Sequence, residues 1–585
     1  FDPPSPGEAN GAGFDGFVAD TQFSVDRGFY EDEFEVEITS ATPGARIRYT
    51  TDGAPPTERS GTAYAGPIRI DRTTTLRAIA FKQGFRPTNV DTHTYIFPAD
   101  VVRQPEMDAE IVTAPAYRDT IEEDLKALPT LSLVLPNGSM FGGNGIYDNA
   151  GGRGMAWERA LSVEFFTADG SEEFQVDAGI RIHGADARGH QKKPFKLYFR
   201  SKYGPGRLRH PLFPGRVEEF DKLVLRGGGH EGWTSPYGSG SGAQSHSNTL
   251  LRDQFLRQTH GEMGNLSPRG RHAHLYLNGR YWGLYIIHER PDEEFGQAHL
   301  GGWEEDFDVI KTGGAVVDGN KTNWNAMMRA ANNGVTSDGA YERMHSLIDM
   351  DHFIDAMIVR IWSGDIDWLR SQKTLHETGD RNKNWYALRR TRGDAPGKWK
   401  FFVWDGELSM GKGHRSNRNT TFDLSDVDIN DSPGRLYNKL QDHPEFRLRF
   451  ADRLQKHFFN GGAMTPESNQ ARWRALADGI REAMVAESAR WGDAVRHPPY
   501  TRDGEWQSEV DWMANTFMVR RTRTVRDQFK ALGLYPDLAP PEIRVDGVPQ
   551  HGGIIGTAPV GFTTPSSGAI YFTIDGTDPR IPSVG

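Results

Sequence analysis

Short segments in which hydrophobic and polar residues alternate fill most of the first hundred residues. Phe34-Glu-Val-Glu-Ile-Thr and Ala45-Arg-Ile-Arg-Tyr-Thr are two of them, and Pro-Gly and Asp-Gly turns separate such segments. Alternation with period two and frequent turns predicts a small antiparallel β-sandwich, of the immunoglobulin-like kind, over residues 21–98. Residues 1–20 are rich in Gly, Pro and Ala, and we expect them to form a linker.

The same pattern returns at the other end of the chain. Ile47-Arg-Tyr-Thr-Thr-Asp-Gly-Ala-Pro-Pro matches Ile570-Tyr-Phe-Thr-Ile-Asp-Gly-Thr-Asp-Pro, including the Asp-Gly turn after the strand. This internal repeat predicts a second, truncated β-sandwich over residues 539–585, so we expect the sequence to be a fragment of a longer protein. Both copies resemble the small domain at the C-terminus of chitobiases and β-hexosaminidases. The resemblance implies a spacer that carries no catalytic residue.

The long region between the two copies changes character along its length. Residues 99–129 are predicted to be a linker, and residues 130–538 to be one large domain. A helix is expected over 248–260, and Asn278-Gly279 is a strong hairpin signal. Strands dominate before this hairpin and helices after it, which predicts a bilobal α+β domain. The expected strands begin at Leu131, Leu161, Gly179, Phe195, Lys222, His274, Trp385 and Trp399.

Length and composition narrow the function classes. A chain of 585 residues exceeds what one hydrophobic core usually organises, so two to four domains are expected. The chain has no cysteine, which excludes disulfides, thiolate metal sites and cysteine nucleophiles. A net charge of -11 argues against a nucleic-acid partner, because binding a duplex requires a surface rich in Lys and Arg. No apolar run approaches the roughly 20 residues that span a bilayer.

Acidic and amide side chains follow or flank the predicted strands of the second half. Asp405 comes directly after the hydrophobic segment Trp-Lys-Phe-Phe-Val-Trp, and Glu407 has the parity to share a cation with it. Asn384 precedes the strand Trp-Tyr-Ala-Leu, and Asp365 and Asp367 lie upstream of it. A carboxylate held at the end of a buried strand suits a hard cation that bridges phosphate oxygens. The order acid, amide, acid therefore predicts a phosphotransfer site.

Such a site also needs a strand lysine for the phosphates and a helix that supports it. Lys193 and Lys196 are the candidates, and Lys193 is preferred of the two; their opposite parity allows only one to face a cleft. Asp253, with Arg252, is the candidate on the predicted helix. Glu289 and Arg290 follow the hairpin, where a kinase hinge would lie, so they contact the nucleotide, pair across the lobes or form a structural ion pair.

Taken together, these segments resemble the CotH kinases, the spore-coat protein H group of atypical protein kinases. The matching stretches are Lys-Lys-Pro-Phe-Lys-Leu-Tyr-Phe, Leu-Leu-Arg-Asp-Gln-Phe, Leu-Asn-Gly-Arg-Tyr-Trp-Gly-Leu-Tyr, His-Glu-Arg-Pro-Asp-Glu-Glu-Phe, Asn-Trp-Tyr-Ala-Leu-Arg-Arg and Trp-Lys-Phe-Phe-Val-Trp-Asp-Gly-Glu. The resemblance implies a bilobal kinase-like domain that uses ATP and Mg²⁺ and phosphorylates Ser or Thr of a protein. It implies an extracellular or cell-surface bacterial protein, with glycan association as a further option.

The resemblance also implies residue roles. Asp405 becomes the metal-binding Asp, with Glu407 as a second candidate ligand. Asn384 becomes the catalytic-loop Asn, which also binds the metal, and Asp367 the catalytic Asp. In the family the Asp-Trp pair precedes the Asn by about five positions, whereas residues 369–381 intervene here. Asp380 is therefore a rival for the catalytic role.

Two other functions stay open at this point. If the insertion has dismantled the site, the chain is an inactive kinase-like structural or adhesion protein. Alternatively, Asp365 and Asp367 beside Trp362 and Trp368 resemble the paired acids and aromatic platforms of a carbohydrate-active cleft.

Overall fold

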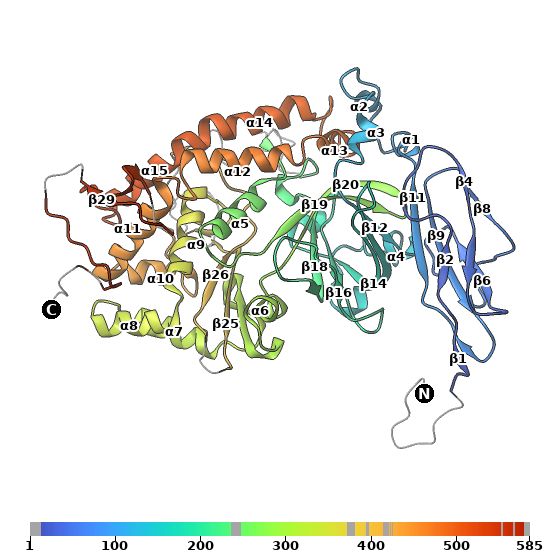
Figure 1. The fold of residues 1–585 in the computed structure, drawn as a ribbon, viewed down its shortest axis with the longest axis horizontal. Coiled ribbons are helices and arrows are strands. Elements are labelled where there is room, and N and C mark those ends of the chain that lie inside the picture. Colours follow the sequence, from blue (N-terminus) through green and yellow to red (C-terminus); the bar gives the residue numbers. More distant parts are fainter. Residues whose placement is uncertain are drawn as a thin grey trace. The chain divides into compact units, whose positions relative to one another are not determined.

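The computed structural model divides the chain into two compact units (Figure 1). Unit 1 comprises Phe1–Leu251, Pro268–Gly301 and Ala475–Val510, and unit 2 comprises Arg252–Ser267, Gly302–Arg474 and Asp511–Gly585. The structure describes residues 13–235, 247–370, 381–393, 397–412, 420–421, 423, 425–550, 554–564, 568–577 and 579.

Unit 1 begins with a β-rich domain. Its largest sheet has the strand order β3-β11-β9-β6-β7 and is accompanied by the strand pairs β1-β10, β2-β5 and β4-β8. Val36, Leu76 and Tyr95 are among the buried residues of its core. Alternation along these strands places one set of side chains in this core. The strands are β1 (Gly16–Phe17), β2 (Thr21–Phe23), β3 (Gly28–Phe29), β4 (Phe34–Val36), β5 (Ile38–Ser40), β6 (Arg46–Thr50), β7 (Thr62–Ala63), β8 (Ile68–Ile70), β9 (Thr74–Phe81), β10 (Phe85–Arg86) and β11 (Asp91–Ile96).

Residues 99–129, expected to be a linker, contain short helices that pack into a core. Helices α1 (Pro98–Val101), α2 (Ala109–Val112) and α3 (Ile121–Asp124) bury Val101, Ile111 and Ile121. These side chains share one hydrophobic cluster with Tyr276 and Val485, far along the chain. One-turn helices have little stability of their own, so this tertiary packing holds them.

A closed seven-stranded barrel forms the middle of unit 1. Its strands follow the order β12-β13-β14-β15-β18-β20-β19, with β12 and β19 parallel. The interior is a buried apolar cluster that includes Leu133, Phe165 and Leu225. At the β19–β20 turn, Asn278 and Gly279 have φ angles of 49° and 77°, as a two-residue hairpin requires. The strands are β12 (Thr130–Val134), β13 (Arg159–Phe166), β14 (Glu173–Ile182), β15 (Phe195–Tyr198), β18 (Lys222–Arg226), β19 (Gly270–Leu277) and β20 (Arg280–His288).

Unit 2 combines a four-stranded sheet with helices. The sheet order is β22-β21-β25-β26, and helix α9 (Met350–Ser363), buried along nearly all its length, contacts β26. The sheet strands are β21 (Phe307–Lys311), β22 (Ala315–Asp318), β25 (Trp385–Arg390) and β26 (Lys400–Val403). Helices of this unit include α5 (Arg252–Glu262), α7 (Thr322–Asn332), α8 (Asp338–Leu347), α10 (Pro433–Leu440), α11 (Pro444–Phe458) and α15 (Met518–Ala531).

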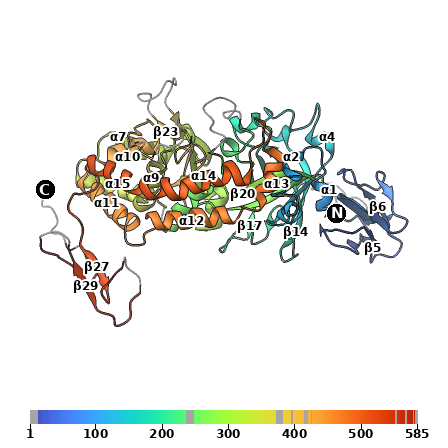
Figure 2. The ribbon, with the colours of Figure 1, turned by 90° about the horizontal axis from the view of Figure 1, so that it is seen from above.

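The C-terminal repeat contributes a small three-stranded sheet to unit 2. Strands β27 (Glu542–Val545), β28 (Val548–Pro549) and β29 (Val560–Thr563) pair in the order β28-β27-β29 (Figure 2). Ile543, Val548 and Val560 are exposed in it. With its N-terminal β-rich domain, barrel and helical unit, the chain is a mixed α/β multidomain protein.

Helix α5 begins four residues later than the sequence predicts. Leu250 has a φ of 62°, so the residues before Arg252 do not enter the helix. The buried Glu231 carboxylate accepts the Leu251 backbone N–H at 3.2 Å and the Thr249 hydroxyl hydrogen bond. A side chain distant in sequence thus holds the segment that precedes the helix. No helix among the described residues is long and apolar enough to cross a membrane.

Candidate functional site

The C-terminus of helix α9 places two predicted acids. Gly364 ends the helix in the left-handed conformation, with φ 61° and ψ 40°, and the chain turns at once into Asp365 and Asp367. The Asp367 backbone N–H donates to Asp365 Oδ1 at 2.8 Å. Asp365 is buried, whereas Asp367 is partly exposed. Only Asp367 is therefore accessible to a substrate.

Asp367 and Asn384 are in direct contact. The Asn384 side-chain amide donates to Asp367 Oδ2 at 3.1 Å and to its backbone carbonyl at 2.9 Å. Asn384 adopts φ 57°, and its own N–H donates to Thr312 Oγ1 at 3.0 Å. Lys383 Nζ lies 3.6 Å from Asp367 Oδ1. The amide and acid that the sequence proposed as partners thus meet.

The apparent insertion between them closes at its base. Strands β23 (Leu369–Arg370) and β24 (Arg381–Asn382) pair antiparallel, with Leu369 opposite Asn382 and Arg370 opposite Arg381. The chain therefore leaves directly after Asp367 and returns directly before Asn384. Asp380, the rival catalytic acid, lies outside the described residues.

Asp405 follows strand β26 with φ 59°, and Gly406 comes next. The Gly406 N–H donates to Asp253 Oδ1 of helix α5 at 2.9 Å. A Cβ on Gly406 would lie 2.5 Å from Leu256 Cδ1, so the loop packs tightly on this helix. Asp253 also pairs with Arg257 at 3.2 Å. The structure thus brings Asp253 to the Asp405 loop and buries Glu407 beside it.

Arg360, a residue that the sequence did not single out, joins these segments. Its guanidinium donates to the backbone carbonyls of Trp404 and Asn384, each at 3.2 Å, and pairs with Asp365 Oδ2 at 3.1 Å. It also lies 5.2 Å from the centre of the Trp368 ring. One buried cation therefore fixes the residue before Asp405, Asn384 itself and the Asp365 turn. Its signal in the sequence is a lone arginine inside the apolar run Met-Ile-Val-Arg-Ile-Trp.

The charge of Asp365 depends on this arrangement. Burial and the nearby Asp367 and Asp405 carboxylates raise the pKa of Asp365 to about 7, against the lowering effect of Arg360. The effect of Asp405 shows that it shares the electrostatic environment of the Asp365–Asp367 turn. Three acids and one amide thus gather around Arg360.

The predicted lysines belong to unit 1. Lys196, on β15, is buried and lies 3.9 Å from Asp292 Oδ2, which Arg290 and Lys222 approach at 3.7 and 3.4 Å. Burial first, and then Arg290, lower the pKa of Lys196 to about 7. Burial and the cations Arg290 and Lys196 likewise lower the pKa of His183. Lys196 therefore belongs to a largely buried network of charged side chains that includes Arg290, Lys222 and Asp292.

Lys193 and Glu289 have protein partners. The Lys193 ammonium donates to the backbone carbonyls of Arg188 at 2.7 Å and His190 at 2.9 Å. Glu289 accepts from the Arg269 side chain at 3.0 and 3.1 Å and lies 2.8 Å from His299 Nε2. Burial raises the pKa of Glu289, but these two partners outweigh it and lower the value. Glu289 therefore forms a structural ion pair.

Lys192, which the sequence did not single out, forms a buried ion pair. Its Nζ lies 2.5 Å from Glu487 Oε1 on helix α13 (Ala483–Trp491), and both side chains are fully buried. Glu487 Oε2 also accepts the Leu284 N–H at 2.7 Å. Nothing in the sequence indicated this pair, because the alternation of side chains along the strand that starts at Phe195 does not extend across Pro194 to Lys192. Its partner, Glu487, is also remote in sequence.

The arrangement of side chains bears on which kind of metal site the chain can form. Among the described residues, no group of three or more His, Asp or Glu side chains is arranged to hold a metal ion. Mg²⁺ bound to a nucleotide needs fewer, because phosphates and water complete its shell. The Asp405 carboxylate and the side-chain amide oxygen of Asn384 are of the required chemical type.

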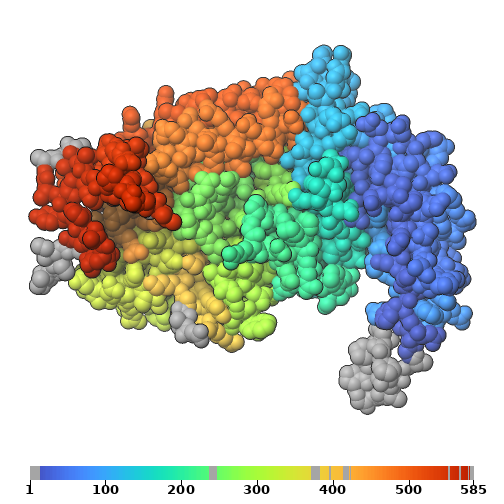
Figure 3. Space-filling view, in the orientation of Figure 1, coloured from blue at the N-terminus to red at the C-terminus, as the bar shows by residue number. Residues whose placement is uncertain are grey.

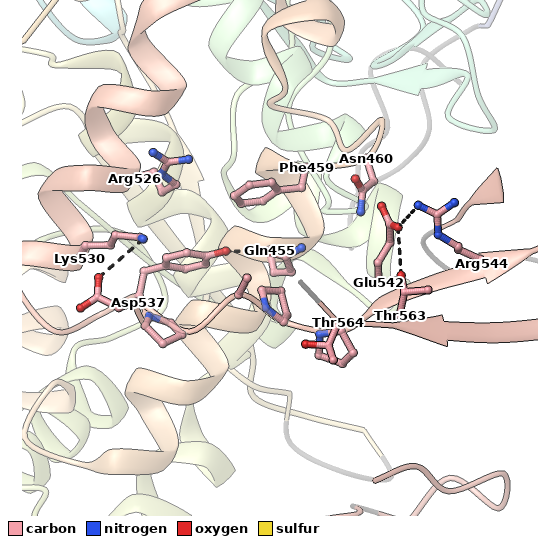
Figure 4. A pocket seen from close by; sticks show the side chains of 15 residues that line it. Gln455, Phe459, Asn460, Arg526, Lys530, Asp537, Glu542, Arg544, Thr563 and Thr564 are labelled. Atoms are coloured by element: carbon pink, nitrogen blue, oxygen red, sulfur yellow. Dashed lines mark hydrogen bonds and ion pairs between the residues drawn. The ribbon is translucent and has the colours of Figure 1, made fainter. Parts of the chain in front are cut away.

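Two further observations concern other kinds of site. Trp362 and Trp368 are 0% and 2% exposed, so neither provides the aromatic platform of a carbohydrate cleft. A cavity of about 480 Å³ lies between α11, α15 and the strands β27 and β29 (Figure 4). Two ion pairs lie among its lining residues, Lys530 with Asp537 at 3.7 Å and Arg544 with Glu542. None of the predicted site residues lines it.

Comparison with known proteins gives two matches. A family described as CotH kinase protein matches residues 180–525, more than half of the chain. The chitobiase/beta-hexosaminidase C-terminal domain matches residues 25–92. No curated protein matches the chain. Both family matches agree with the resemblances seen in the sequence. The first begins near the end of β14, so β12 and β13 of the barrel precede it.

Proposed function

Because the chain belongs to the CotH kinase protein family, we propose that it is a protein kinase, which transfers the γ-phosphate of ATP to Ser or Thr of a secreted or cell-surface protein. Its membership supports a kinase-like protein, and the arrangement of unit 2 supports activity. The N-terminal chitobiase-type domain supports a location outside the cell, since domains of this type recur in large secreted bacterial proteins.

The contact between Asp367 and Asn384 carries the proposal. In protein kinases a catalytic Asp orients the acceptor hydroxyl, and a nearby Asn and a second Asp bind the metal. Here Asn384 Nδ2 holds the Asp367 carboxylate at 3.1 Å, which leaves the amide oxygen for a cation. Asp367 is accordingly our catalytic residue, and Asp405 and Asn384 are our metal ligands. Bound Mg²⁺–ATP would supply the phosphoryl group and neutralise its charge.

Arg360 keeps this arrangement ready for substrate. Its hydrogen bonds to the Trp404 and Asn384 carbonyls fix the backbone on both sides of the proposed metal position. Catalysis of phosphoryl transfer depends mostly on positioning and charge neutralisation, so rigid ligand loops favour it. Asp365 forms an ion pair with Arg360 and takes no part in the phosphoryl transfer.

The family also implies a lysine that contacts the phosphates of ATP, and both candidates, Lys193 and Lys196, belong to unit 1. Of the two candidate lysines, Lys196 is the better phosphate ligand, because burial and Arg290 lower its pKa and so favour an anion beside the pair, whereas Lys193 Nζ donates to two carbonyls. An approaching phosphate would raise the depressed pKa of Lys196 and keep it charged.

The main alternative is a kinase-like surface protein without activity. That interpretation depended on the insertion separating Asp367 from Asn384. Because β23 and β24 pair at its base, the insertion does not separate them. A carbohydrate-active protein is disfavoured by the burial of Trp362 and Trp368.

ATP binding tests the proposal. We expect Mg²⁺ and ATP together to raise the melting temperature of the chain, since a ligand at 100 times its Kd stabilises by about 2.7 kcal/mol. Asp405→Asn should abolish this rise. Asp546→Asn is a matched control, because Asp546 also has a positive φ, 51°, but lies in the β27–β28 turn. A wild-type chain that shows no ATP-dependent rise would contradict the proposal.

Phosphate transfer is the second measurement. Incubation with γ-labelled ATP and a Ser/Thr-rich acceptor should label the acceptor with the wild-type chain and the Asp546→Asn control. Asp367→Asn should bind ATP as the wild type does but transfer no label, because it lacks the base that orients the hydroxyl. Binding without transfer in the wild type would favour the inactive alternative.

A further inference from the structure

The N-terminal β-domain meets the barrel through a buried polar group. Glu164, on β13, is fully buried, and its Oε1 accepts the Thr94 N–H of β11 at 3.0 Å. The Thr94 hydroxyl donates to the same carboxylate and lies 2.8 Å from Ser132 Oγ on β12. Arg27 Nε lies 3.3 Å from Glu164 Oε1 and is 10% exposed. One barrel carboxylate is thus bound by two segments of the β-domain.

The charge of Glu164 is balanced at this junction. Burial raises the pKa of Glu164, and Arg27 and the Thr94 hydrogen bonds oppose that effect. The nearby cations, Arg27 and Arg77, both belong to the β-domain. Loss of the cations that balance a buried carboxylate is costly. Separation of the domains would leave Glu164 with the Ser132 hydroxyl of β12 but without Arg27 and the two Thr94 donors.

A second contact joins two turns. Asn278, in the β19–β20 turn, accepts the Leu135 N–H at 2.9 Å. Gly53, from the Asp-Gly turn of the β-domain, lies against both residues, because a Cβ there would come within 2.6 Å of the Leu135 oxygen and 2.8 Å of Asn278 Oδ1. The repeated Asp-Gly turn in this copy therefore fits directly onto the barrel.

Residues 99–129 make the third contact. The Gln104 side chain accepts the Tyr281 N–H at 3.0 Å and donates to the Gly279 carbonyl at 3.4 Å. Glu106 pairs with Arg280 of the same hairpin. The Asp108 N–H donates to the Ala489 carbonyl of α13 at 2.6 Å. Figure 3 shows this segment, in light blue, packed against the dark blue β-domain without a gap on the face in view.

We propose that the N-terminal β-domain and residues 99–129 form an intramolecular docking module for the barrel, locked by Glu164, and that this copy of the repeat is not a spacer. The module binds both β12 and the β19–β20 hairpin, and β12 and β19 are the strands whose parallel pairing closes the barrel. It therefore stabilises the barrel closure itself. The proposal depends only on these contacts and stands independently of kinase activity.

A cleavage experiment tests whether docking persists without the covalent link. A protease recognition sequence is inserted between Pro115 and Ala116, both in a solvent-accessible part of the 99–129 segment. After complete cleavage of the full chain, we expect the N-terminal piece to co-elute with the remainder at low micromolar concentration in size-exclusion chromatography. Separation of two folded pieces would overturn the proposal, because a spacer domain would leave once cut.

Substitutions test whether Glu164 holds the β-domain on the barrel. Glu164→Lys places a second cation against Arg27 and should weaken the association of the cleaved pieces by at least about 100-fold, the loss expected for one partner of a buried pair. Glu173→Lys, an equal charge change at an exposed position on the adjacent strand β14, should have no effect. If Glu164→Lys impairs expression, Arg27→Met provides a milder test, and unchanged association in both variants would refute the role of Glu164.

Discussion

Removal of Arg360 should destabilise the candidate site by an amount that depends on pH. Arg360→Met deletes the 3.1 Å ion pair with Asp365 and the two 3.2 Å hydrogen bonds to the Trp404 and Asn384 carbonyls. Above pH 7, Asp365 is ionised in the folded wild-type chain, and loss of its partner then adds the cost of taking up a proton, about 1.4 kcal/mol for each pH unit above the pKa. At pH 5, Asp365 is already protonated, so the loss reduces to that of ordinary buried hydrogen bonds, about 1–3 kcal/mol.

The direction in which stability changes with pH follows from the pKa of Asp365. Its value of about 7 in the folded chain exceeds the value of about 3.9 expected in the unfolded chain. Protonation therefore favours the folded state, and the stability contributed by Asp365 is complete below pH 4 and is lost as the pH rises through 7. The difference corresponds to roughly 4 kcal/mol at most. Without Arg360 the pKa rises further, so the loss continues above pH 7.

Hydrogen exchange of peptides covering residues 360–368 and 404–412 measures the local loss of stability. It does not require two-state unfolding, which a chain with two units need not show. We expect Arg360→Met to lower protection by up to about 1.4 kcal/mol more at pH 8 than at pH 5, the free energy of one pH unit above the wild-type pKa. Asp365→Asn combined with Arg360→Met should remove the pH dependence, and Arg343→Met, at an exposed position on α8, should show no effect. An equal cost at both pH values would refute the assignment of the pH dependence to Asp365.

Three further substitutions examine other parts of the fold. Gly283→Ala, whose Cβ would lie 2.7 Å from Glu487 Oε2, should lower the free energy of thermal unfolding by more than about 2 kcal/mol; Gly264→Ala, with a φ of +93° and no atom within 4 Å, shows the cost of backbone strain alone. Lys192→Met should cost about 3–5 kcal/mol in chemical denaturation, and a Lys192→Met/Glu487→Leu double variant should regain much of it; an equal loss in both would show that the unpaired charge is unimportant. Asn384→Gly keeps the left-handed backbone but deletes the amide, so we expect near-wild-type melting without ligand and no rise with Mg²⁺ and ATP; a retained rise would exclude Asn384 as a metal ligand.

Local sequence patterns predicted the elements well but not the contacts that assemble them. The alternation around Phe195 and the Asn278-Gly279 turn gave barrel strands and a hairpin, because both signals act over a few residues. The partner of Lys192 is Glu487, and the partners of Arg360 lie on loops that follow different strands. No spacing rule connects such positions, so the sequence directed attention to Lys193 instead.

The packing of residues 99–129 was likewise not predictable from their own sequence. Its helices are single turns without a long amphipathic pattern, so the sequence favoured a linker. In the structure Ile111 and Ile121 join a cluster with Tyr276 and Val485. The stabilising residues belong to the barrel hairpin and to α13, which only the folded chain brings to this segment.

The insertion after Asp367 offers a test that separates the two rival catalytic acids. Closing a longer loop costs only about 0.6 kcal/mol for each doubling of its length, so the pairing of β23 with β24 holds Asp367 and Asn384 together despite the added residues. Replacing residues 371–380 by Asn-Gly suits the antiparallel register of Arg370 and Arg381 and deletes Asp380. We expect the shortened chain to keep both the Mg²⁺- and ATP-dependent rise in melting temperature and the transfer of label. If ATP still binds but transfer is lost, Asp380 is the catalytic acid and the assignment of Asp367 is wrong; if binding is lost too, the insertion itself supports the ligand loops, and the spacing found in the family is a poor guide to this chain.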